Sequence, residues 1–363
     1  MIVIGTDTHK RTHTCAAVFA QTGQLAGELT ASAREPGFRE LLAWGRDLDE
    51  ERIWAIEDCR HVSGSLERFL IASGERVVRV PPKLMGQSRR GERSAGKSDP
   101  IDALAIARAA LREGPETLPA AYLDERSLRV KLLLDHREDL VKARSEDQCR
   151  LRWHLHDLWP ELELPAGCLD RIVWLDRIAR KLARAEQGTR VRIARELVKE
   201  IRRRTRRIKE LEREIAALVK AQAPELLELE GCGALTAAKL IAETAGAERL
   251  ASDAKFARLA GVAPIPASSG NRVRHRLDRG GNRQLNCALH RIAVSQGQAH
   301  PPARDFLAKK QAEGKSRMEA LRCLKRHLAR RVWRLLLESE RERPMTTVDP
   351  QRGKLTPQIA AAA

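Results

Sequence analysis

MIVIGTDTHK, residues 1–10, opens the chain with an apolar run that predicts a β-strand over Met1–Thr6 and places Asp7 just after it. Two more strands with a turn at Gly23 follow, and strands and helices then alternate. We expect strands over Cys15–Ala20, Gln24–Thr30, Arg52–Ile56 and Arg76–Val80, and helices over Pro36–Leu48, Ser63–Ala72 and Pro100–Leu111. This order combines a hairpin meander with crossover units, so it indicates an α/β ribonuclease-H-like sheet and not an alternating Rossmann fold.

The strand pattern disappears between about Asp124 and Gln222. Leucines recur there at steps of three, four and seven residues with charges between them, as in an amphipathic helix. Pro160, Pro165 and Gly167 interrupt the pattern, which predicts a long antiparallel helical hairpin or coiled-coil arm. Such an arm can be a spacer or dimer contact, or the basic stretch Arg202–Lys209 can contact nucleic acid directly.

The third region begins at Pro224 and is predicted to be mostly α-helical. Its segment Gly231–Gly246 resembles a helix-hairpin-helix, in which backbone N–H groups hold a phosphate. An ordinary tight turn between helices is the alternative. We therefore divide the chain into residues 1–115 (α/β domain), 116–222 (helical arm), 223–342 (C-terminal domain) and 343–363 (disordered tail).

The composition points to a polyanionic partner. Among 363 residues, 67 Lys or Arg outnumber 49 Asp or Glu, and the net charge is +18. Aromatic residues make up only 3%, which argues against domains that stack bases on aromatic rings. No apolar run approaches membrane-spanning length, and the first ten residues lack the apolar core of a signal peptide. Seven cysteines without a C-x-x-C pair favour reduced cytosolic thiols over a disulfide framework or a zinc site.

Four carboxylates lie at the ends of predicted elements: Asp7, Glu57, Asp99 and Asp102. The last two are three residues apart at the start of a helix, and therefore on one face. Neighbouring strand ends can bring Asp7 and Glu57 beside that helix. Such a cluster requires cations, and oxygen ligands suit Mg²⁺ or Mn²⁺, which activate nucleophiles at phosphorus. Taken singly, each acid is as well explained as a surface charge, and Asp99 as a helix N-cap.

Residues Gly91–Ser98 match the phosphate-binding P-loop pattern G-x4-G-K-S/T. The context argues against ATP binding, because residues 81–90 separate the motif from the preceding strand. We interpret the segment as a basic stretch, including Lys97, that approaches a phosphate backbone.

Together these residues resemble the insertion-sequence-110 family of DEDD transposases. The resemblance lies in GTDTHK with Asp7, WAIED with Glu57, and GKSDPIDA with Asp99 and Asp102, followed by LLELEGCGALTAAKLIAE and FARLAGVAPIPASSGNRVRHRLDRGGNRQL. It covers about half of the chain. It implies a RuvC-like N-terminal domain that holds Mg²⁺ or Mn²⁺ with the four acids, and a transposase that cuts and rejoins DNA.

The family also implies a serine nucleophile in the C-terminal domain. It corresponds to Ser269, although a shift to Ser268 stays open. A serine hydroxyl needs a base or a metal to become reactive. The basic side chains of the same segment would hold the scissile phosphate: Arg272, Arg274, Arg276, Arg279 and Arg283.

The resemblance further implies a bridge RNA that pairs with donor and target DNA, so that base pairing selects the sequence. We also expect a homo-oligomer, either dimer or tetramer, in the bacterial cytoplasm and at the nucleoid when active.

Three other functions remain open. A RuvC-like nuclease would use the acids and water without a serine, and an architectural nucleic-acid-binding protein would not be catalytic. A tyrosine recombinase would depend on Tyr122, the single tyrosine, which lies outside both resembling blocks.

Overall fold

The computed structural model describes residues 1–57, 60–81, 84, 98–118, 120–121, 125–268, 275–276, 278 and 280–341. The chain divides into two compact units. One comprises residues 1–124 with 246–256, and the other comprises residues 125–245 with 257–340. The P-loop-like motif up to residue 97 and the predicted tail lie outside the described residues.

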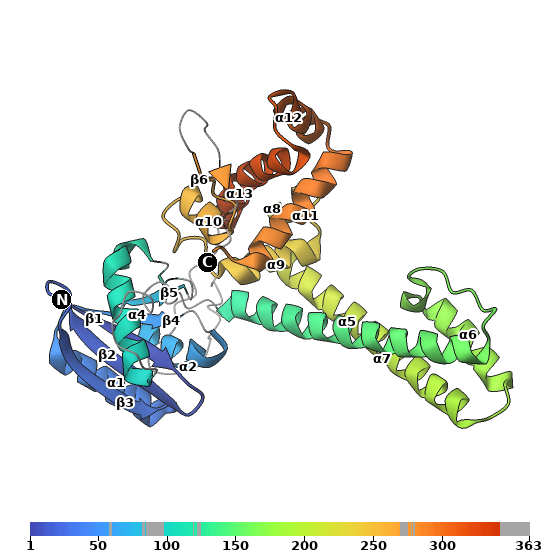
Figure 1. Cartoon of the computed structure of the whole chain (residues 1–363), viewed down its shortest axis with the longest axis horizontal. Helices are drawn as coiled ribbons and strands as arrows, with labels where there is room; N and C mark the ends of the chain where they lie inside the picture. Colours follow the sequence, from blue (N-terminus) through green and yellow to red (C-terminus); the bar gives the residue numbers. More distant parts are fainter. Residues whose placement is uncertain are drawn as a thin grey trace, which may run out of the picture. The chain divides into compact units, whose positions relative to one another are not determined.

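The first unit is built on a five-stranded sheet in the order β3-β2-β1-β4-β5. The strands are β1 (Ile2–Thr8), β2 (Thr12–Phe19), β3 (Leu25–Ser32), β4 (Arg52–Glu57) and β5 (Val77–Val80). β1, β2 and β3 form an antiparallel meander, whereas β4 and β5 run parallel to β1. The predicted ribonuclease-H-like fold is therefore confirmed (Figure 1).

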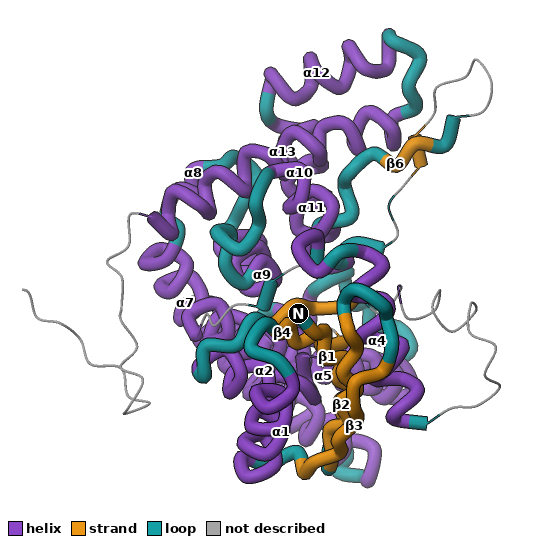
Figure 2. The backbone as a smooth tube through the Cα atoms, turned by 90° about the vertical axis from the view of Figure 1, so that its left-hand side faces the viewer, coloured by secondary structure: helices purple, strands orange, loops and turns teal. Residues whose placement is uncertain are grey.

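Alternate side chains of the sheet pack on opposite layers of helices. In β1 and β4, even-numbered residues such as Ile4 and Trp54 pack on α1 (Glu35–Leu48) and α2 (Arg60–Ala72). In the same two strands, odd-numbered residues such as Val3 pack on α4 (Asp99–Glu113). Figure 2 shows the strands between α1 and α2 on one side and α4 on the other.

Gly5 allows α4 to lie directly against β1. A Cβ atom on Gly5 would lie 2.1 Å from the Ala103 carbonyl oxygen and 2.4 Å from the Ala107 nitrogen. Only a residue without a side chain fits, so Gly5 determines how closely α4 approaches Asp7 two residues further along.

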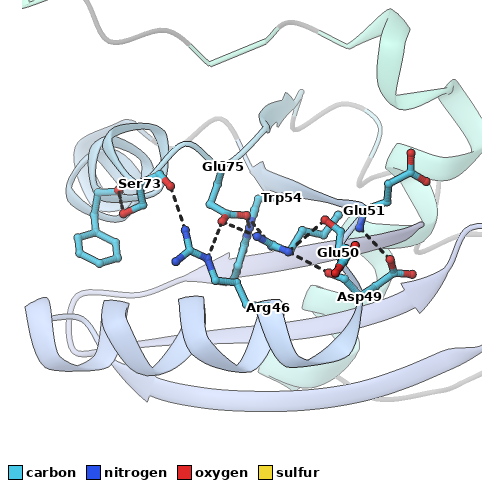
Figure 3. Close-up of polar contacts among 9 residues, drawn as sticks. Arg46, Asp49, Glu50, Glu51, Trp54, Ser73 and Glu75 are labelled. Atoms are coloured by element: carbon cyan, nitrogen blue, oxygen red, sulfur yellow. Dashed lines mark hydrogen bonds and ion pairs between the residues drawn. The ribbon is translucent and has the colours of Figure 1, made fainter. Parts of the chain in front are cut away.

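A buried carboxylate, Glu75, ties the other helical layer to the sheet (Figure 3). It accepts hydrogen bonds from Arg52 (2.7 Å), Trp54 (3.1 Å) and Arg46 (3.1 Å). Burial alone would raise the pKa of Glu75, but these three donors outweigh it and hold the pKa below its usual value. The carboxylate is therefore ionised at neutral pH and stabilises the junction of α1, β4 and β5.

The second unit begins with the predicted helical arm, whose hairpin is confirmed. Helix α5 (Glu125–Leu158) packs along α7 (Thr189–Gln222), and η2 (Cys168–Asp170) and α6 (Ile172–Arg184) lie between them in sequence. Ion pairs join the two long helices, among them Arg137–Glu212 and Arg204–Asp147 (2.9 Å). Helix α6 packs on α7, and the sequence pattern did not distinguish it as a separate element.

The rest of the second unit is mostly helical, as predicted. Its elements are α8 (Glu225–Glu228), α9 (Ala234–Thr244), β6 (Ile265–Pro266), β7 (His275–Arg276), α11 (Arg283–Ala299), α12 (Pro301–Ala312) and α13 (Arg317–Arg341); α10 (Asp253–Leu259) spans the boundary between the units. The helix-hairpin-helix-like segment is formed by α8, a turn at Gly231 with φ +80°, and α9.

Among the described residues, no helix is both long and apolar enough to cross a membrane. The six cysteines within that part of the chain are free thiols.

Candidate functional site

Asp7 is the penultimate residue of β1 and is 8% exposed. In the parallel pairing, Thr6 lies opposite Ile56, so Asp7 and Glu57 follow at the same level of neighbouring strands. Both are odd-numbered positions and therefore belong to the face that α4 covers. The strand ends thus bring Asp7 and Glu57 to one edge of the sheet, as the sequence predicted.

Helix α4 begins at this edge with Asp99 and Asp102 in its first turn. Ser98 occupies the N-cap position without a side-chain hydrogen bond, and Pro100 belongs to the first turn. Asp99 is the first helical residue, so its alternative interpretation as the N-cap is wrong. The Asp99 side chain is 52% exposed, whereas Asp102 is buried.

A histidine, His9, joins the acids. His9 Nε2 lies 3.1 Å from Asp7 Oδ2 and 3.3 Å from Asp99 Oδ1. Ligand atoms of Asp7, His9 and Asp99 all lie within 4.8 Å of one another. Within the described part of the chain, this group includes neither Glu57 nor Asp102. No spacing rule predicts His9, because the loop after β1 brings it back toward the strand end.

The electrostatics of the cluster favour a cation. Burial raises the pKa of Asp7 above its usual value; nearby His9 lowers it, and the charges of Asp102 and Asp99 raise it. The net shift is upward, so the ionised form of Asp7 is destabilised in the ion-free protein. A divalent cation would relieve this repulsion.

The donor set fits a divalent metal. Two carboxylates and one imidazole lie close enough to share an ion, and carboxylate oxygens are preferred ligands of Mg²⁺ and Mn²⁺. The imidazole nitrogen suits Mn²⁺ better than Mg²⁺. Asp7, Asp99 and His9 lie close enough to hold one ion together, and Glu57 and Asp102, which lie near Asp7, would complete its ligands.

The predicted C-terminal site falls only partly within the described residues. Ser269, Arg272, Arg274 and Arg279 lie outside them, as does Lys97 of the first unit. Ser268 is exposed, Arg276 is exposed in β7, and Arg283 is the exposed first residue of α11.

A basic cavity of about 1030 Å³ adjoins β7. Its cations include Arg276, Lys310, Lys315, Arg322, Lys325 and Arg326. Lys325 is 6% exposed and donates a hydrogen bond to Asn286 Oδ1 at 2.6 Å, and burial lowers its pKa. The sequence signal for Lys325 was a lysine on the apolar face of α13, between Leu324 and Leu328.

The glycine-rich motif before α11 has a clear packing role. A Cβ atom on Gly281 would lie 2.1 Å from the backbone nitrogen of Gly261, so the two backbones pass in contact. Asn282 caps α11 by accepting hydrogen bonds from the backbone N–H groups of Gln284 and Leu285. Asn286 donates to the carbonyls of Ala260 and Gly261, both at 3.0 Å. The motif therefore fixes the start of α11 against the turn after α10.

A ribonuclease-H-like sheet with acids at adjacent strand ends and on the covering helix is typical of enzymes that cut nucleic-acid strands. Comparison with known proteins extends this conclusion. A family model for the DEDD transposases of IS110 elements matches residues 4–160, and a model described as "Transposase IS116/IS110/IS902 family" matches residues 223–308. The chain belongs to the IS110 family of transposases.

Two curated relatives match nearly the whole chain. An uncharacterized 44.8 kDa protein of insertion element IS116 from Streptomyces clavuligerus is 27% identical, over 92% of this chain and 94% of its own. An uncharacterized 42 kDa protein of IS900 from Mycobacterium paratuberculosis is 25% identical, over 94% of this chain and 97% of its own. A solved structure of T. thermophilus RuvC with a Holliday junction covers 33% of this chain and 99% of RuvC, with 16% identity and a TM-score of 0.26. Because this TM-score is low, the assignment of the fold rests on the order of the strands and not on this similarity.

Proposed function

We propose that this transposase cuts and rejoins DNA strands of its insertion sequence with Mg²⁺ or Mn²⁺ held by Asp7, Glu57, Asp99 and Asp102. The observation that carries the proposal is the cluster of Asp7, His9 and Asp99 at the end of β1. A bound divalent ion would supply charge neutralisation and polarise the phosphate oxygens. Asp7 and Asp99 would bind it from the strand and the helix, and His9 would give a nitrogen ligand.

Substitution of the acids tests this role. Asp7→Ala, Glu57→Ala, Asp99→Ala and Asp102→Ala should each abolish recombination while folding stays intact. Because such groups act as one unit, a double variant should be no worse than a single one. Strand transfer that persists in two of the four single variants would contradict the assignment.

Ser269 is the proposed nucleophile. Its Oγ would bond to the scissile phosphorus as the bond from phosphorus to the departing deoxyribose oxygen breaks. The hydroxyl proton would pass to a base, and the departing oxygen would take up a proton. Attack by a hydroxyl of the incoming strand would release Ser269 and join the strands. The support is the family resemblance, Gly270 next in the chain, and the basic residues that follow, Arg272, Arg274, Arg276, Arg279 and Arg283. Lys97 of the first unit is a further proposed phosphate contact.

A denaturing gel distinguishes this mechanism from hydrolysis. Labelled DNA should remain attached to wild-type protein and not to Ser269→Ala, with Ser268→Ala as the adjacent control. An adduct lost only in Ser268→Ala would shift the nucleophile by one residue. Without any adduct, the metal-dependent nuclease that uses water becomes the better function.

We also propose a structured bridge RNA as partner, because the family resemblance implies one; the net charge of +18 and the aromatic content of only 3% fit such a partner. RNA purified with the protein should match DNA flanking its reading frame. Sequence-selective cutting by RNA-free protein would contradict this.

The proposed assembly is a dimer or tetramer, which sedimentation of the DNA-bound protein would measure. The proposed domains of each subunit are residues 1–115, 116–222 and 223–342, followed by the tail 343–363.

A further inference from the structure

The distal end of the helical arm carries an excess of positive charge. Residues 171–199, here called the arm tip, contain nine Lys or Arg but only three Asp or Glu, a net +6. This stretch comprises α6 and the first turns of α7. Figure 1 shows α6 beside the ends of α5 and α7, at the opposite end of the arm from α9.

Most of these cations lack a carboxylate partner. Within the described residues, Arg190 pairs with Asp157, while the acid Asp176 pairs with Arg202. The remaining eight cations of the arm tip form no ion pair with described residues: Arg171, Arg177, Arg180, Lys181, Arg184, Arg192, Arg195 and Lys199.

The middle of the arm differs, although its sequence is more basic. Arg203, Arg204 and Arg207 there pair with Glu200, Asp147 and Glu210. Their charge is therefore partly neutralised within the protein. Unpaired positive charge is therefore more abundant at the arm tip than in the Arg202–Lys209 stretch.

The unpaired cations surround two hollows on a packed apolar base. One cavity, of about 800 Å³, is lined by Arg192, Arg195 and Lys199, and another, of about 520 Å³, by Arg177, Arg180 and Arg184. Beneath them, buried α6 and α7 side chains form a continuous core that includes Leu175, Ile178, Leu182, Val191, Ala194 and Val198. The cations are thus held on a folded lobe.

The aromatic rings of the lobe favour a backbone contact over base stacking. Arg177 lies 5.1 Å from the centre of the Trp174 ring, and Lys181 lies 4.5 Å from that of Trp159. Because cations already lie over the Trp174 and Trp159 rings, these rings are poor platforms for unpaired bases.

We propose that the arm tip binds the phosphate backbone of duplex DNA. The proposal rests on the DNA-cutting function of the family and adds a contact surface to it. Helix α5 has 34 residues, so at 1.5 Å per residue the arm is about 51 Å long. About 15 base pairs of B-DNA cover that length. The arm tip would hold flanking DNA without reading its sequence.

Two full-length variants test the proposal. The tip variant combines Arg180→Gln, Arg184→Gln, Arg192→Gln and Arg195→Gln. The control combines Arg39→Gln, Arg150→Gln, Arg203→Gln and Arg207→Gln, exposed arginines that already pair with carboxylates. Both remove four charges from exposed positions, and circular dichroism would verify folding.

Binding is measured on a random-sequence DNA duplex of about 60 base pairs between about 50 and 200 mM salt. At about 50 mM salt the tip variant should lose at least about tenfold in affinity, and the slope of log K against log salt should fall by about 3 in magnitude. The control should lose less than about threefold. Equal losses in both variants, or none in the tip variant, would overturn the proposal.

Two further experiments test whether the arm tip binds something other than the DNA backbone. A tip variant that keeps DNA affinity but loses affinity for a structured RNA hairpin would assign the surface to RNA and overturn the proposal. Trp153, 71% exposed on α5, provides a second check. Loss of DNA binding in Trp153→Ala but not in the tip variant would show that bases stack on Trp153, and it would overturn the proposed contact between the arm tip and the phosphate backbone. DNA binding in this assay requires no strand cutting. A negative result for the arm tip therefore does not contradict the proposed acidic site, and loss of the acidic site does not contradict DNA binding by the arm tip.

Discussion

The imidazole of His9 lies 3.3 Å from the carboxylate of Asp99 and so joins the end of β1 to the first turn of α4. The same nitrogen contacts Asp7. The proposed metal site therefore has a ligand set of mixed oxygen and nitrogen atoms.

His9→Ala should weaken Mn²⁺ binding by about tenfold and Mg²⁺ binding less, because imidazole suits Mn²⁺ better. Isothermal titration with each metal alone measures both affinities. His136→Ala, at an exposed position on α5, is the control. Equal weakening of both metals would show that His9 orients the acids without binding the ion.

The ion-free site should destabilise the fold at neutral pH. The pKa of Asp7 is raised above 3.8 in the folded protein, so its ionised form is less favourable there than in the unfolded chain. The penalty is absent below the unfolded pKa and fully present above the raised folded pKa. Asp7→Asn should accordingly raise Tm at pH 7 without metal and remove the increase in Tm that Mg²⁺ gives the wild type. Thermal melts with and without MgCl₂ test both effects, and a lowered Tm in metal-free Asp7→Asn would contradict the first.

Gly5→Ala should disturb α4 and the site together. The added methyl would collide with the α4 backbone near Ala103, and overpacking of this kind costs about 1–3 kcal/mol. Gly27→Ala is the matched strand control, because its nearest contact would be Trp44 at 3.6 Å. Urea unfolding and Mn²⁺ titration should show losses in Gly5→Ala alone. Normal metal affinity in Gly5→Ala would mean that the approach of α4 does not set the site.

Glu75→Gln should destabilise the first unit by about 3 kcal/mol at pH 7, since it leaves buried donors without their charged acceptor. The pKa of Glu75 is lowered, so its contribution is present above the unfolded value of about 4.5 and is lost as pH falls through the folded value. The gap between wild type and variant in urea unfolding should narrow in acid. Exposed Glu35→Gln is the control, and a gap that stays constant down to the acid limit would refute the role of the charge.

The sequence predicted the sheet well where apolar runs are continuous. β1 covers the predicted run but continues to Thr8, so Asp7 lies inside the strand and not just after it, and β4 ends at Glu57. The start of β2 was missed because Thr12, His13 and Thr14 are polar; the last two are nevertheless buried at 1% exposure between neighbouring strands. Polar residues inside a sheet escape a pattern based on hydropathy.

Contacts between distant residues could not be predicted. The joining of Asp7 with Asp99 depends on Gly5 admitting α4, and His9 depends on a return of the loop after β1. The unpaired charge of the arm tip follows from which arginines meet a carboxylate. No local pattern contains that information.

The most direct test of the acidic site pairs metal binding with DNA cutting in the same preparations. Mn²⁺ bound to the protein is counted by electron paramagnetic resonance, and cutting of the element's DNA is measured with the wild type, Asp7→Asn and Asp99→Asn. We predict that the wild type binds Mn²⁺ and cuts DNA, and that each variant loses both while remaining folded. Cutting at the wild-type rate in Asp7→Asn would contradict the assignment of the site.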